Sequence, residues 1–86
     1  MFSNEIINKI AAHGSNAASV SAFLTRATVP SVKSEVTDWS SAVRAEVNVA
    51  FEYYPDSIQS AVSLAGARLR NIYGATAREF ILNLGE

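Results

Sequence analysis

Apolar residues recur along the whole chain at steps of three and four positions, which is the period of an α-helix. Pro30 and Pro55 divide the pattern into three segments of similar length. The apolar rows are Phe2, Ile6, Ile10, Ala17, Val20, Leu24 and Ala27, then Val32, Val36, Trp39, Val43, Val47, Ala50 and Tyr54, then Ile58, Val62, Ala65, Leu69, Ile72, Thr76, Phe80 and Leu84. No segment alternates with the two-residue period of a strand, so the pattern predicts an all-α protein.

Residues suited to helix ends stand near the start of the chain and beside the two prolines. Ser3 is placed to cap the first helix, and Ser31, directly after Pro30, is placed to cap the second. Pro55 cannot continue a helix and restricts the residue before it. Asp56 then stands where its carboxylate accepts hydrogen bonds from the first turn of the next helix. The stretch around Pro55 therefore predicts a helix end followed at once by a helix start.

Two glycines leave the number of helices open. Gly14 is followed by Ser15, as at a helix end and a new cap, and Gly74 precedes Thr76 and Glu79 at capping-box spacing. The apolar rows nevertheless continue through both glycines in phase. We therefore predict one domain, residues 1–86, folded as a small three-helix bundle of long helices with a kink or short interruption at Gly14. Five shorter helices, with breaks at Gly14 and Gly74, are the alternative.

Composition narrows the class of protein. The chain has 86 residues, no cysteine, a net charge of -1 and 17% charged residues, with 25 positions filled by alanine or serine. This share of charged residues is below the roughly 25% that is usual in soluble domains. Neighbouring copies of the chain therefore repel one another weakly, and the many small residues allow helices to approach closely. A small chain without disulfides often gains stability by packing on another chain. The composition suits a self-associating protein, and equally a small Ala-rich helical monomer.

The sequence favours a cytoplasmic location, or delivery by a route that needs no cleaved signal. No stretch reaches the ~18–20 apolar residues that span a bilayer. Asn4 and Glu5 stand where a signal peptide has its basic region. No membrane partner is expected.

Asp56-Ser57-Ile58 resembles the triplet at which acyl-carrier proteins attach phosphopantetheine to serine. That resemblance would imply Ser57 as the attachment site. The chain departs from the carrier pattern because Pro55 replaces the usual glycine and the strong acidic charge is missing. Asp and Ser also begin helices of every kind. We therefore predict a structural role for Ser57 and no cofactor.

Other polar groups predict neither catalysis nor metal binding. His13 is the only histidine, and its place beside Gly14 suits hydrogen bonding to the last carbonyls of a helix. The carboxylates are predicted to line a solvated face: Glu35, Asp38, Glu46, Glu52 and Asp56. The sequence therefore predicts no enzyme, no metal site and no small-molecule substrate.

Arg68, Arg70 and Arg78 give a weak indication of nucleic-acid binding. Arginines with Tyr73 between them could contact phosphates and bases. A pI near 5.7 is unlike the basic balance of nucleic-acid-binding domains. Pairing of an arginine with the acidic second segment is the simpler expectation. A dimeric nucleic-acid-binding regulator is therefore the alternative function.

The apolar residues are more numerous than one core stripe per helix requires. Trp39, Phe51 and Tyr54 are predicted to be core, whereas Tyr53 is off the row and predicted to be exposed. The residues left over predict a protein-binding surface: Val49, Tyr53, Leu64, Phe80, Ile81, Leu82 and Leu84. The sequence thus favours a non-catalytic interaction module, either a self-associating structural subunit or a small inhibitor or adaptor that binds a protein partner.

Overall fold

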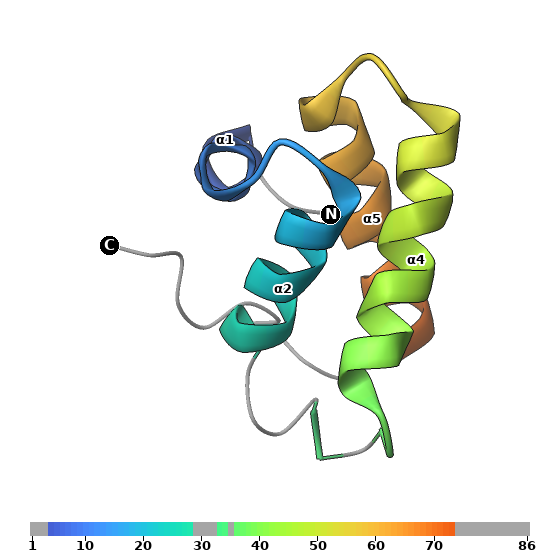
Figure 1. Cartoon of the computed structure of the whole chain (residues 1–86). Coiled ribbons are helices and arrows are strands. Elements are labelled where there is room, and N and C mark those ends of the chain that lie inside the picture. Colours follow the sequence, from blue (N-terminus) through green and yellow to red (C-terminus); the bar gives the residue numbers. More distant parts are fainter. Residues whose placement is uncertain (1–3, 29–32, 35, 74–86) are drawn as a thin grey trace.

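Four α-helices make up most of the part of the chain that the structure describes (Figure 1). This computed structural model describes residues 4–28, 33–34 and 36–73. The helices are α1 (Asn4–His13), α2 (Ala17–Ala27), α4 (Trp39–Tyr53) and α5 (Ile58–Tyr73). The prediction of an all-α fold is confirmed.

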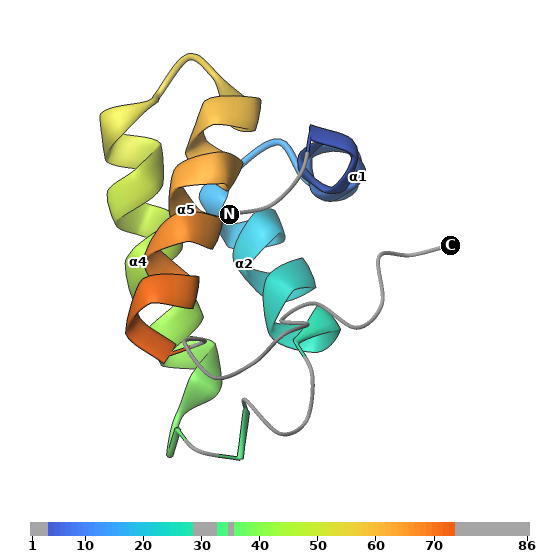
Figure 2. The same cartoon turned by 180° about the vertical axis from the view of Figure 1, so that it is seen from behind.

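Each of the four helices packs against two others. Helix α4 contacts α2 and α5, and α1 contacts the same two helices. In Figures 1 and 2, α2, α4 and α5 run roughly along one direction, whereas α1 is seen end-on and so lies across them. The ring of contacts encloses a core to which all four helices contribute.

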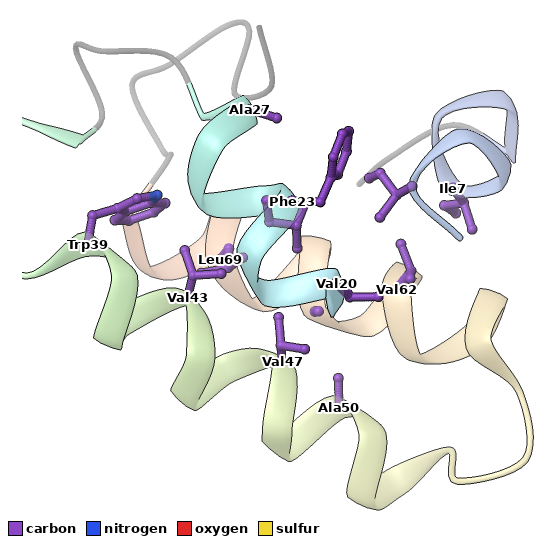
Figure 3. Close-up of a cluster of buried hydrophobic side chains, with 13 residues drawn as sticks. Ile7, Val20, Phe23, Ala27, Trp39, Val43, Val47, Ala50, Val62 and Leu69 are labelled. Atoms are coloured by element: carbon purple, nitrogen blue, oxygen red, sulfur yellow. The ribbon is translucent and has the colours of Figure 1, made fainter. Parts of the chain in front are cut away.

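The core follows the apolar rows of the sequence for the most part, and Ile7 and Phe23 join it from positions outside those rows (Figure 3). Its buried residues are Ile7, Ile10, Val20, Phe23, Leu24, Ala27, Trp39, Val43, Val47, Ala50, Val62, Ala65 and Leu69. Burial of a large aliphatic side chain stabilises the fold by about 1.5–3 kcal/mol, so these rows are the main source of stability. Phe51 and Val36 are half-buried and pack against the same cluster.

Two residues predicted for the core are exposed instead. Tyr54 is 45% exposed and Ile72 is 52% exposed. Tyr54 follows the last turn of α4 and has φ -129° and ψ 69°, so it leaves the helical row. At 100° per residue, the core row of α5 passes from Leu69 to Tyr73 rather than to Ile72. The Tyr73 ring accordingly packs edge-on against Trp39, with ring centroids 5.3 Å apart.

The first segment is two helices rather than one long helix. Helix α1 ends at His13 and α2 begins at Ala17. The Asn16 side chain accepts from the Ser19 amide at 2.9 Å, and Ser19 Oγ accepts from the Asn16 amide, which together form a capping box. The chain therefore breaks at Gly14, as the alternative of shorter helices has it, and the apolar phase persists because α1 and α2 face the same core. Gly74, the other predicted break, lies outside the described residues.

Helix α4, which corresponds to the second segment of the sequence pattern, begins later than the position of Pro30 suggests. Asp38 is its N-cap, and Oδ1 of Asp38 accepts from the Ser41 amide at 3.2 Å. Before it, the Val36 amide donates to the Lys33 carbonyl in a turn. The helix thus starts at Trp39, and Ser31, the predicted cap, lies outside the described residues.

Candidate interaction surface on the α4–α5 hairpin

A short turn joins α4 to α5 and is closed by local hydrogen bonds. The Tyr54 amide donates to the Ala50 carbonyl at 3.1 Å and ends α4. The Ser57 carbonyl accepts from the Ala61 amide at 3.0 Å, and Ser57 Oγ accepts from the Ser60 amide at 3.2 Å. These two bonds place Ser57 at the N-cap position of α5. The predicted stop and start around Pro55 is confirmed.

The capping residue is Ser57 and not Asp56. Asp56 is an exposed residue of the turn, one position too early to have its carbonyl accept the first helical bond. The Asp56 prediction is therefore wrong by one residue. The Ser57 hydroxyl, which also donates to Ser60 Oγ at 3.0 Å, is engaged in starting the helix. Ser57 therefore lies at the helix start, where a structural role was predicted for it.

The exposed large apolar side chains of the described residues all belong to this hairpin. Tyr53 is 71% exposed, Tyr54 45% and Ile72 52%. Tyr53 was predicted to be exposed, and that prediction is confirmed. Exposed tyrosines are common where proteins bind one another, because the ring is large and rigid and the hydroxyl can hydrogen-bond.

Two open depressions flank the tyrosines. The first, of about 370 Å³, is lined by Val49, Glu52 and Tyr53. The second, of about 250 Å³, is lined by Tyr54, Ser60, Ser63, Leu64 and Ala67. We call these eight residues the hairpin surface. Its sides are mostly small or apolar, so a partner's side chain could enter without displacing bulky groups.

An ion pair joins the two helices of the hairpin. Arg68 Nε donates to Glu46 Oε1 at 2.8 Å. Val49 lies one turn beyond Glu46 on α4, and Leu64 lies one turn before Arg68 on α5, so both lie on the same side of the hairpin. Both are half-buried, and Leu64 also packs against the core cluster.

The hairpin surface includes three of the seven residues predicted for an interface. Val49, Tyr53 and Leu64 lie on it, whereas Phe80, Ile81, Leu82 and Leu84 lie outside the described residues. Sequence reasoning missed Tyr54, because its phase matches the core row. The proline that follows Tyr54 was the feature that could have revealed its exposure.

The arginines of α5 differ in their surroundings. The expected pairing of an arginine with the acidic second segment is confirmed by the Arg68–Glu46 contact, in which the Glu46 side chain is only 13% exposed. Arg70 is half-buried in the last turn of α5, and Arg78 lies outside the described residues.

Away from the hairpin turn, the carboxylate of Asp38 caps the start of α4. Hydrogen bonds from the Ser41 hydroxyl and amide lower the pKa of Asp38 below its ordinary value. His13 is the last residue of α1. Within the described ranges, His, Asp and Glu side chains form no group of three that could hold a metal ion. No helix of that part is long and apolar enough to cross a bilayer.

Comparisons of the chain with protein-family models, with curated proteins and with solved structures find no match.

Proposed function

We propose that this protein is a non-catalytic interaction module that binds a protein partner through the hairpin surface. The observation that supports this most directly is the pair of consecutive tyrosines, Tyr53 and Tyr54, exposed beside two depressions with Val49 and Leu64 in their walls. The partner is a different protein or a second copy of the chain.

Burial of the tyrosines would supply the binding free energy. Each aromatic side chain buries about 150–250 Å² when fully covered, and a tyrosine has only two side-chain torsions to immobilise. Ser60, Ser63 and Ala67 on α5 leave room for a partner's side chains. The sequence adds Phe80, Ile81, Leu82 and Leu84 to the proposed interface as a second contribution, from beyond the described residues.

The experiment compares a surface variant with a matched control. Tyr53→Asp places a charge on the hairpin surface, and Ala18→Asp places the same charge at an exposed position of α2. Solution mass is measured by light scattering over a concentration series, and partner capture from lysate of the native host is quantified by mass spectrometry. We expect Tyr53→Asp to abolish the assembly or the capture, while Ala18→Asp preserves both.

The proposal fails under two results. One is a strict monomer that captures no protein above background. The other is capture, or an oligomer, that survives Tyr53→Asp unchanged, since the contact would then lie elsewhere on the molecule.

A further inference from the structure

The hairpin carries negative charge and no basic residue along most of its length. Residues 45–67 contain Glu46, Glu52 and Asp56 but neither lysine nor arginine. Arg68 neutralises Glu46 through their 2.8 Å contact. Two carboxylates, Glu52 and Asp56, are left at the end of the hairpin where the tyrosines are exposed.

Glu52 belongs to the binding surface itself. It is exposed, and it lines the same depression as Val49 and Tyr53. Asp56 is exposed in the turn, two residues after Tyr54. No ion pair joins either carboxylate to another residue in the part of the chain that the structure describes. The charge at this end is therefore available to a partner.

We propose, building on the proposed function, that the hairpin surface binds a cationic amphipathic segment of a different protein. Apolar side chains of that segment fill the depressions beside Val49 and Leu64. A lysine or arginine lies against the Tyr53 ring and faces Glu52. A cation beside both an aromatic ring and a carboxylate is attracted by each of them.

The same charges disfavour a second copy at this surface. A two-fold symmetric contact sets the same patch on both subunits, so Glu52 and Asp56 would approach their own copies. Like charges brought together at an interface oppose binding. A nucleic-acid backbone would be repelled for the same reason. A basic protein segment is the occupant whose charge complements the surface.

The test uses the full chain, labelled with ¹⁵N, and three short peptides as probes. The first is an amphipathic helix of leucine and lysine, the second has glutamate in place of lysine, and the third has the leucine–lysine composition in a scrambled order. Amide chemical shifts report both affinity and location. We expect the first peptide to bind most tightly, with shifts concentrated in residues 49–56 and 60–67 and an affinity that falls as salt rises.

Two variants with the same net charge distinguish binding at the hairpin surface from non-specific electrostatic attraction to the whole protein. Glu52→Gln and Glu5→Gln change the net charge equally, but Glu5 is on α1 and lies 3.9 Å from Lys9. We expect Glu52→Gln to weaken binding of the leucine–lysine peptide about two- to fivefold, the size of one exposed charge pair, and Glu5→Gln to leave it unchanged. The inference is overturned if the glutamate peptide binds as tightly as the lysine peptide, or if Glu52→Gln and Glu5→Gln weaken binding equally. It is also overturned if the chemical-shift changes lie outside the hairpin surface, or if no peptide binds.

Failure here is distinguishable from failure of the proposed function. If no cationic peptide binds, yet Tyr53→Asp still abolishes capture of the native partner, the interaction module stands and only the partner chemistry is wrong. If Tyr53→Asp leaves capture intact, the surface itself is wrong.

Discussion

The indole N–H of Trp39 donates a hydrogen bond to the hydroxyl oxygen of Thr28, with Nε1 and Oγ1 2.9 Å apart, and both side chains are buried. The Thr28 hydroxyl in turn donates to the Leu24 carbonyl at 2.6 Å. The start of α4 is thereby joined to the end of α2. Because the Tyr73 ring packs edge-on against Trp39, the end of α5 meets the same point.

Thr28→Val is expected to lower the free energy of unfolding by about 1–3 kcal/mol, because it keeps the shape but removes the acceptor of a buried indole N–H. The matched control is Thr25→Val, since Thr25 Oγ1 donates only to the Ser21 carbonyl of its own helix, at 2.8 Å. Urea unfolding followed by circular dichroism measures both. Equal losses in the two variants would show that the bond between the helices contributes nothing particular.

Ser57→Ala is expected to cost about 1 kcal/mol of stability, the usual effect of losing an N-cap side chain. Asp56→Ala, one residue earlier, is expected to change stability by less than about 0.5 kcal/mol, as is usual at an exposed site. Urea midpoints of the two variants decide which residue caps α5. Intact mass of the protein from its native host checks the same serine chemically, and an added phosphopantetheine on Ser57 would contradict the structural role.

Helix ends show where the sequence was informative and where it was not. Pro55 marked the end of α4 correctly because a proline acts through its own backbone, without tertiary contacts. The start of α4 was misplaced because Asp38 and Ser41 resemble any polar pair until their hydrogen bonds are seen. The break near Gly14 was underestimated for a related reason. An unbroken apolar phase indicates that two segments pack against the same core, but it does not indicate that they form one continuous helix.

The candidate surface was predictable only in part. Tyr53 and Val49 were found because they are displaced from the core row of α4. Tyr54 was missed because its exposure depends on φ and ψ at a single residue after the helix end. The two depressions depend on how α5 packs on α4, which periodicity does not specify.

The stability of the α4 start is expected to depend on pH through Asp38. Its pKa is lowered from 3.8 by hydrogen bonds from Ser41, so deprotonation of Asp38 favours the folded state. The contribution is complete above that unfolded value of 3.8 and is lost as the pH falls through the lower folded pKa. Asp38→Asn keeps a good cap without the charge. We expect urea midpoints of the native chain and Asp38→Asn to converge below pH 3.8, and a constant difference at every pH would contradict this.

Nucleic acid is expected to bind weakly at physiological salt. Even if Arg68, Arg70 and Arg78 all met phosphates, the slope of log affinity against log salt would be only about -2.7. Arg68 is already paired with Glu46, which lowers that limit. A gel-shift titration with duplex and single-stranded DNA measures the affinity. Submicromolar, sequence-selective binding would establish the alternative function instead.

Leu64→Asp and Leu82→Asp are expected to separate folding from association. Leu64 is half-buried and packs against the core, so an aspartate there should destabilise the fold as well as disrupt the hairpin surface. Leu82 is predicted from its phase to belong to an interface, so its substitution should lower oligomer mass or partner binding with helix content nearly unchanged. Light scattering, partner capture and circular dichroism on each variant measure the three quantities.

If Leu82→Asp unfolds the protein, Leu82 belongs to the monomer core and is not an interface residue. If it alters neither mass nor capture while Tyr53→Asp abolishes both, binding is confined to the hairpin surface. That result would fit the proposed basic partner segment, which contacts only the end of the hairpin that carries Glu52 and Asp56.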